Sequence, residues 1–193
     1  LRSAKDALHL ELDYRDARDY LYGTADNVEG VVECVYTGTR VETLGIPDTT
    51  VMNTEHTWPQ SRGGDTGPAQ SDLHHLYPVT AAANVQRSNL FYGLVVAPTW
   101  EVGGSLRGAD ASGDTRFEPR DSHKGNAARA LFYIAVMYQL DLDAREEALV
   151  RQWHVADPVD EEERRRNQLI ANIQVSRNPF VDDPGLVDRI SDF

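Results

Sequence analysis

Glu55 and His56 form the adjacent pair in this chain with the clearest potential for chemistry. Thr57, Trp58 and Pro59 follow them, and Pro59 lacks a backbone N–H and disfavours helical geometry at Trp58, so the pair ends an extended segment. Successive side chains of a strand point to opposite faces, so the two groups need separate partners. One can face a metal ion while the other faces a substrate phosphate, which suits hydrolysis of a phosphodiester.

A second polar group could reach the same metal ion. We expect strands over residues 51–55 and 73–77 and a helix over residues 81–88, an order that brings Asn84 toward Glu55. Carboxylate and amide oxygens are hard ligands that suit Mg²⁺, with Mn²⁺ or Ca²⁺ as alternatives. Magnesium keeps several waters and takes only one or two protein oxygens together with substrate phosphate, so two protein ligands are enough.

His56 is the predicted general base. An imidazole with an ordinary pKa of about 6.5 is largely free at neutral pH to take a proton from water. The metal and an arginine would stabilise the charge that develops on the phosphate and on the leaving 3′-oxygen. The candidate arginines are Arg62, just after the pair, and Arg87, one helical turn after Asn84. Asn89 competes with Asn84 for the role of second ligand.

Three further side chains could touch substrate or could be structural. Trp58 either packs in the core or stacks on a nucleic-acid base. Lys124 and Arg129 lie near the start of a predicted helix and are candidate phosphate contacts. In each case the structural interpretation competes with the functional one.

Other conspicuous side chains are predicted to be structural. His74 and His75 are adjacent on a predicted strand, so they would face opposite ways and would not chelate one ion together. The run Arg164–Arg166 follows three glutamates at i,i+3 spacing and is most simply a salt-bridged helix face, with a DNA-contacting patch as the alternative. Cys34 is the only cysteine in the sequence, which excludes an intramolecular disulfide and a cysteine zinc cluster and favours a small buried side chain.

Composition is that of one globular domain over residues 1–193, with 40% hydrophobic and 26% charged residues. The net charge of −12, from 31 acids and 19 bases, requires any polyanion site to be a local basic cleft on an acidic body. The sequence lacks an apolar run of the roughly 18 residues needed to span a membrane, so no membrane partner is expected. Its first residues also lack an apolar signal core.

The pattern of elements predicts an α+β class, with a small β part first and packed helices after it. Predicted strands cover residues 30–36, 40–44, 51–55 and 73–77. Predicted helices cover residues 3–22, 81–88 with Thr80 as N-cap, 124–140, 143–154 and 158–175, with one short turn within 181–193. Glycine-rich residues 60–70 and 93–121 are predicted to be loops.

Several blocks together resemble the bacterial endonuclease I family of non-specific nucleases. They include Asn53-Thr-Glu-His-Thr-Trp-Pro-Gln-Ser61, Ser71-Asp-Leu-His-His-Leu-Tyr-Pro78 and Asn84-Val-Gln-Arg-Ser-Asn89. Further similar pieces lie within residues 117–133 and 177–184, in the order of the family. Glu-His alone would be a weak signal, but the ordered set is specific.

The resemblance implies a ββα-metal (His-Me finger) core at about residues 51–90 and a helical part at about 122–193. It implies Glu55 and Asn84 as ligands of a single divalent metal and His56 as general base. It also implies DNA and RNA as substrates, cut with little sequence preference to 5′-phosphate products by a secreted or periplasmic enzyme. Cutting without sequence preference needs no dimer symmetry, so a monomer is expected. This chain departs from the family in lacking the disulfides of some members, in placing His75 where many have Asn, and in having a short loop after the motif.

Two other functions remain open at this stage. A nuclease-like domain could hold nucleic acid without cutting it, although the base and both ligand positions are present. A phosphodiesterase acting on a small or lipid phosphate would need the same residues. Cleavage of plasmid, binding without cleavage, and turnover of a small diester alone separate the three.

Overall fold

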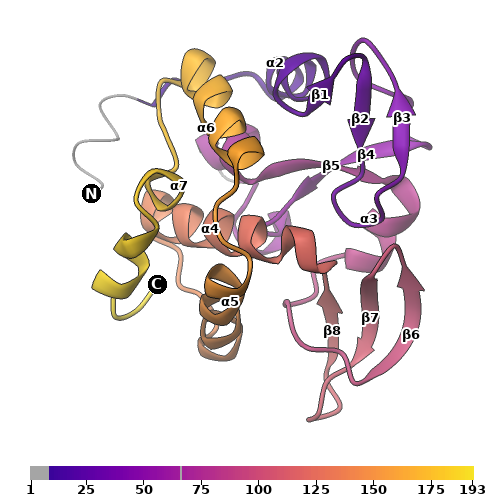
Figure 1. Ribbon diagram of the computed structural model, residues 1–193, viewed down its shortest axis with the longest axis vertical. Helices are drawn as coiled ribbons and strands as arrows, with labels where there is room; N and C mark the ends of the chain where they lie inside the picture. Colours follow the sequence, from indigo (N-terminus) through magenta and orange to yellow (C-terminus); the bar gives the residue numbers. More distant parts are fainter. Residues whose placement is uncertain (1–8, 66) are drawn as a thin grey trace.

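The computed structural model describes residues 9–65 and 67–193, which form helices and three small antiparallel sheets (Figure 1). The strands are β1 (Asn27–Val28), β2 (Val31–Glu33), β3 (Arg40–Glu42), β4 (Met52–His56), β5 (Leu76–Thr80), β6 (Ala97–Val102), β7 (Ser105–Ala109) and β8 (Thr115–Glu118). The α-helices are α2 (Tyr14–Tyr20), α3 (Ala81–Arg87), α4 (Asp121–Tyr138), α5 (Ala144–Ala156), α6 (Glu161–Gln174) and α7 (Pro179–Asp182). A π-helical turn covers Leu21–Ala25, and 3₁₀ turns cover Gln60–Arg62, Gly67–Ser71, Leu73–His75 and Pro184–Arg189. This mixture confirms the α+β class.

The antiparallel pair β4–β5 followed by α3 carries the predicted catalytic residues. Glu55 lies opposite Tyr77 in the pair, and His56 ends β4. Thr80 caps α3 as predicted, because its hydroxyl accepts a hydrogen bond from the backbone N–H of Ala83 at 3.3 Å. The cap turns the chain from β5 directly into α3, which packs beside β4.

Helix α4 crosses the middle of the molecule and provides much of the core (Figure 1). Its side chains are buried around most of its circumference, for example at Ala127, Leu131 and Ile134. α5 and α7 pack against it, and the buried cluster continues to Phe193. Over the described ranges, no helix combines the length and apolar character that crossing a membrane requires.

The first predicted helix differs most from the structure among the helices. Residues 1–8 lie outside the described part, so the start of the predicted 3–22 helix is not addressed. α2 begins only at Tyr14, because Asp13 is extended and its carboxylate accepts a hydrogen bond from the backbone N–H of Arg15. Leu10 instead donates its backbone N–H to the carbonyl of Gln174 at 2.8 Å.

The second strand of the site begins later than predicted. Leu73–His75 is a 3₁₀ turn whose N-cap is Asp72, and the strand covers residues 76–80. The strand prediction for 73–77 was therefore wrong over its first three residues. A side-chain cap at Asp72 favours a turn, and this local hydrogen bond outweighs the extended tendency of the sequence.

Residues 93–121 were predicted as a loop but contain the sheet β6–β7–β8. Gly103 and Gly104, at φ 61° and 89°, form the tight turn between β6 and β7. Nearly all of β6 is exposed, so its sequence carries no alternation of apolar and polar residues. The strands predicted at 30–36 and 40–44 are shorter, whereas the helices predicted from residue 81 onward agree within a few residues.

Candidate active site

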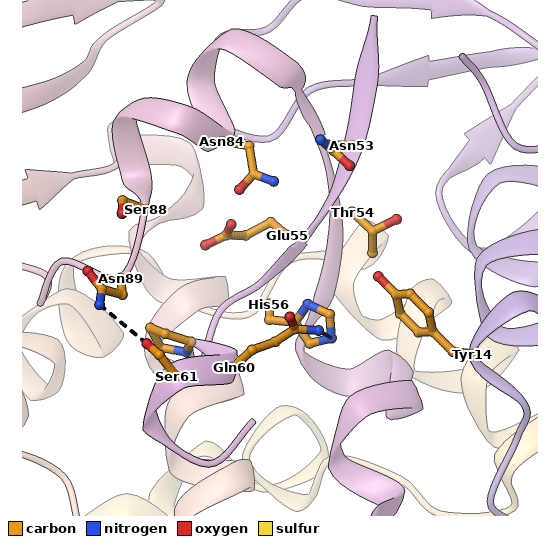
Figure 2. Close-up of a pocket in the computed structure, with 11 residues that line it drawn as sticks. Tyr14, Asn53, Thr54, Glu55, His56, Gln60, Ser61, Asn84, Ser88 and Asn89 are labelled. Atoms are coloured by element: carbon orange, nitrogen blue, oxygen red, sulfur yellow. Dashed lines mark hydrogen bonds between the residues drawn. The ribbon is translucent and has the colours of Figure 1, made fainter. Parts of the chain in front are cut away.

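A pocket of about 430 Å³ opens beside β4 and α3. β4 contributes its C-terminal half, α3 contributes Asn84, and the turn after Pro59 closes one side. Figure 2 shows the polar side chains converging on this space. The lining residues are Tyr14, Asn53, Thr54, Glu55, His56, Pro59, Gln60, Ser61, Asn84, Ser88 and Asn89.

Glu55 is a buried carboxylate held by one of its two oxygens. Tyr36 donates its hydroxyl hydrogen to Oε1 at 3.0 Å, and Arg87 Nε lies 3.3 Å from the same oxygen. Among the described residues, no donor reaches Oε2. Burial raises the pKa of Glu55 to about 7, although the charge of Arg87 and the Tyr36 hydrogen bond oppose this rise. The carboxylate is thus oriented, and one oxygen remains available for a ligand.

Arg87 lies behind Glu55 rather than in the pocket. Its side chain is fully buried, and its guanidinium donates to the carbonyls of Leu90 and Thr57. The guanidinium carbon also lies 4.2 Å from the ring centroid of Tyr92, whose hydroxyl is 2.8 Å from that of Tyr36. This placement does not bring Arg87 to a substrate phosphate as predicted, because all of its surroundings are protein. It compensates the charge of the buried carboxylate instead.

His56 has a fixed tautomer because Nε2 lies 2.9 Å from the backbone carbonyl of Gln70. A carbonyl oxygen only accepts, so Nε2 donates and Nδ1 of the neutral ring carries the lone pair. Burial, together with the nearby His75, lowers the pKa of His56 to about 3. The ring lies 5.7 Å from that of Tyr14, centroid to centroid. His56 is therefore a neutral imidazole with an acceptor nitrogen throughout the neutral pH range.

Asn84 faces the same space as Glu55. Figure 2 shows its amide on the pocket side of α3, directed toward the carboxylate. Over residues 9–65 and 67–193, its side-chain amide makes no hydrogen bond. Asn89, the competing choice, instead donates its amide to Ser61 Oγ at 3.3 Å. The geometry favours Asn84 over Asn89 as the partner of Glu55.

The residues present fit a hard divalent cation. Glu55 offers a carboxylate oxygen and Asn84 an amide oxygen, neither engaged by other described side chains, and these are the donors that Mg²⁺ accepts. In the described part of the chain, no group of three or more His, Cys, Asp or Glu residues is arranged to hold a metal. The candidate metal centre is therefore a carboxylate–amide site.

Comparison with known proteins gives the family. The sequence model of the family named Endonuclease I matches residues 11–185, which is most of the chain. The chain belongs to the endonuclease I family.

Curated proteins similar to this chain carry nuclease names. An extracellular ribonuclease of Bacillus subtilis is 30% identical over 205 residues, covering 94% of this chain and 69% of the relative. An extracellular ribonuclease of Bacillus amyloliquefaciens is 35% identical, covering 72% of this chain and 53% of the relative. An extracellular deoxyribonuclease of Aeromonas hydrophila is 27% identical, covering 58% and 49% respectively. The chain thus spans about half to two thirds of the length of these relatives.

Four other residues that the sequence suggested as substrate contacts or charge stabilisers do not line the pocket of this endonuclease I domain. Arg62 pairs with Glu146 at 2.9 Å and lies over the ring of Phe91. Trp58 is 2% exposed, so it packs in the core and cannot stack on a base. Lys124 donates to two carboxylates, each at 2.7 Å. Arg129 is fully buried against Glu163, so the prediction of a phosphate contact there is wrong.

The histidines and arginines predicted as structural are largely so. His74 and His75 are both buried, on a 3₁₀ turn rather than a strand, and each lies within hydrogen-bond distance of a backbone carbonyl. Arg165 pairs with Glu162 in the predicted i,i+3 manner. Arg166 does not: it is buried and pairs with Asp26 at 2.8 Å, because it faces the core side of α6. Arg164 donates to backbone carbonyls.

Some of the residues that form this endonuclease I site were not predicted from the sequence. Asn53 shares a strand face with Glu55, so the period of two could have indicated it. Tyr14 reaches the site from α2, and Tyr36 reaches Glu55 from the segment after β2. These approaches depend on tertiary packing and leave no local signal. Cys34 is buried as predicted.

Proposed function

We propose that this chain is a divalent-metal-dependent endonuclease that hydrolyses DNA and RNA with little sequence preference and leaves 5′-phosphate ends. The observation that carries the proposal is the convergence of two unengaged oxygen donors, on Glu55 and Asn84, beside a histidine with a free acceptor nitrogen. Relatives named for ribonuclease and for deoxyribonuclease support both substrates. Relatives named as extracellular or periplasmic proteins support a secreted or periplasmic location. The enzyme would act as a monomer, since cutting without sequence preference needs no dimer symmetry.

His56 would act as the general base. Its Nε2–H is held by the carbonyl of Gln70, which directs Nδ1 away from that carbonyl and keeps the ring from rotating. A water beside Nδ1 would lose its proton to the ring as it attacks the phosphorus. The low pKa of His56 keeps the ring unprotonated at neutral pH, so Nδ1 is able to accept a proton.

Glu55 and Asn84 would hold one divalent cation, with Mg²⁺ as the expected ion and Mn²⁺ or Ca²⁺ as alternatives. Such an ion, when bound, supplies Lewis-acid stabilisation of charge on the phosphate and on the leaving oxygen. Tyr36 and Arg87 both contact Oε1 of Glu55. These two contacts keep the carboxylate from rotating and so fix the position of Oε2. Arg87 is thus a positioning residue, and Arg62 has no part in the pocket.

The test is cleavage of supercoiled plasmid and of a structureless RNA with Mg²⁺ and with EDTA. Nicked and linear plasmid and shortened RNA should appear with Mg²⁺ and should be absent with EDTA. Retardation of intact plasmid under both conditions would mean a binding protein. Turnover of a small diester with both nucleic acids intact would mean a small-substrate phosphodiesterase. Cleavage in EDTA equal to that in Mg²⁺ would contradict the metal dependence.

A further inference from the structure

A nuclease of this charge needs a local cation at the substrate strand, and the basic residues predicted for that task are already neutralised. Arg62, Arg87 and Arg129 each pair with a glutamate, and Lys124 pairs with two carboxylates. The net charge of −12 makes an uncompensated phosphate contact still more necessary. The described arginines that have no carboxylate partner are therefore the candidates for this contact.

Few arginines remain without a carboxylate partner. Among the described residues, those with no carboxylate within salt-bridge distance are Arg15, Arg18, Arg40, Arg107 and Arg164. Arg164 is bonded to backbone carbonyls, and Arg107 contacts Gln86 on α3, which does not line the pocket. Arg40 lines a different cavity, bounded by β2 and the start of α4. Arg18 alone in this described set contacts a residue that lines the catalytic pocket.

Arg18 is anchored at the pocket edge by one nitrogen of its guanidinium. Its Nε donates to Thr54 Oγ1 at 3.2 Å, and the hydroxyl of Tyr22 lies 3.2 Å from the same oxygen. Figure 2 shows Tyr14 and Thr54 together on one side of the pocket, across from Ser88 and Asn89. Because Nε is engaged, the side chain is held in place while Nη1 and Nη2 keep their N–H donors.

The ring of Tyr14 lies between Arg18 and His56. Its guanidinium carbon lies 5.8 Å from the ring centroid of Tyr14, and that ring lies 5.7 Å from the ring of His56. The scissile phosphate must lie at His56 itself. Arg18, a half-buried residue beyond Tyr14, therefore suits a neighbouring phosphate of the same strand, to which two parallel N–H groups of a guanidinium can bind bidentately.

We propose that Arg18 binds the backbone phosphate next to the scissile one and so supplies the cation that the described residues of the catalytic pocket otherwise lack. The inference rests on the proposed nuclease function. It assigns substrate binding to α2, an element outside the strand–strand–helix unit that holds the catalytic residues. Arg18 would thereby set the register of the strand across the pocket without touching the reacting atoms.

The experiment measures binding of a fluorescent single-stranded oligonucleotide in EDTA across a series of NaCl concentrations. The protein is compared with Arg18→Ala, Arg18→Lys and Arg15→Ala, the last being an exposed arginine of the same helix. Arg18→Ala should weaken binding about tenfold, since a charge-assisted contact is lost. The slope of log affinity against log salt should become shallower by roughly 0.7, which corresponds to the loss of one phosphate contact on a single strand. Arg18→Lys should keep the slope, and Arg15→Ala should match the unsubstituted protein.

The outcomes separate this inference from the proposed function. If the unsubstituted protein neither binds nor cuts nucleic acid, the function itself fails. If it cuts but Arg18→Ala keeps the salt slope of Arg15→Ala, the phosphate contact is wrong. If Arg18→Ala lowers the thermal midpoint but leaves the salt slope of binding unchanged, Arg18 only stabilises the position of Thr54 and does not bind phosphate. A slope change confined to Arg18→Ala sustains the proposal.

Discussion

At the scale of single residues, the site depends on how the two oxygens of Glu55 are used. Tyr36 and Arg87 contact Oε1, and among the described residues no donor contacts Oε2. Figure 2 shows the carboxylate of Glu55 beside the amide of Asn84 in the pocket. The buried arginine offsets the cost of burying the carboxylate, and the pocket leaves the second oxygen for a ligand. His56 is independent of this arrangement, because its own anchor is the carbonyl of Gln70.

Asn84→Ala should raise the Mg²⁺ concentration needed for half-maximal cleavage, because an amide ligand is lost. We expect an increase of about 10- to 100-fold, the range seen when groups that support a metal site are removed. The thermal midpoint should change little, since the Asn84 amide makes no hydrogen bond among the described residues. Asn89→Ala is the matched control on the same side of the pocket. An effect on the metal requirement from Asn89→Ala alone would transfer the ligand role to Asn89.

The metal requirement should also depend on pH through Glu55. Its pKa is raised to about 7, so below that value the carboxyl carries a proton that Mg²⁺ must displace. Raising the pH from about 6 to about 8 should lower the Mg²⁺ concentration for half-maximal cleavage, with no further fall at higher pH. His56 cannot produce this effect, because its pKa lies near 3. An equal metal requirement at both pH values would contradict the placement of the metal on Glu55.

Much of this residue-level account could be predicted from sequence, and some could not. Glu55, His56 and Asn84 are close in sequence and on regular elements, so a local pattern was enough to bring them together. Arg87 and Arg62 are near Asn84 and His56 along the chain, and this proximity alone favours them as candidates. Their partners, Glu55 for one and Glu146 for the other, decide their roles, and Glu146 lies far away in sequence.

At the scale of elements, buried Asp72 ties the turn before β5 to two helices. Its carboxylate accepts hydrogen bonds from Tyr133 and Tyr138 of α4, at 2.9 and 2.8 Å, and from Gln174 of α6 at 3.0 Å. It also caps the 3₁₀ turn by accepting from the backbone N–H of His74. This network holds β5, and therefore the register of the catalytic strand pair, against the helical layer.

Asp72→Asn should destabilise the fold in a pH-dependent way. Burial would raise the pKa of Asp72, but nearby histidines and the Gln174 hydrogen bond lower it from its ordinary 3.8 to about 2. A lowered pKa means that the stabilisation is present above pH 3.8 and is lost as the pH falls through about 2. The loss in unfolding free energy at pH 7 should be about 2 kcal/mol.

Urea unfolding at neutral pH and at about pH 2.5 measures this difference. Exposed Asp141 provides the control, and Asp141→Asn should leave the unfolding free energy unchanged at both pH values. A loss for Asp72→Asn that is the same at both pH values would show that shape rather than charge matters at this site.

Elements differ in how far their sequence revealed them. α3 and the long helices carry caps and apolar periodicity, so their positions were predictable. The sheet β6–β7–β8 was not, because β6 is exposed along both faces and its turn is made by glycines. The delayed start of β5 followed from the Asp72 cap, a local hydrogen bond that competes with extended geometry.

At the scale of the whole molecule, an acidic body carries the catalytic pocket, and Arg18, which has no carboxylate partner among the described residues, contacts Thr54 at its edge. Most of the described basic side chains pair with carboxylates, which explains how a nuclease family member can hold a net charge of −12. α2 and the β4–β5–α3 unit enclose the pocket from two sides, and the helical layer supports it from behind through Asp72. The predicted fold class holds at this scale.

The central claim is that His56 is the general base of a metal-dependent nuclease. It is tested most directly by plasmid cleavage at saturating Mg²⁺, comparing His56→Ala with the unsubstituted protein and with His154→Ala on α5. Removal of the general base should slow cleavage by about 10²- to 10⁴-fold, while Mg²⁺ binding stays close to that of the unsubstituted protein. His154→Ala should cut at the normal rate. Normal cleavage by His56→Ala would contradict the account.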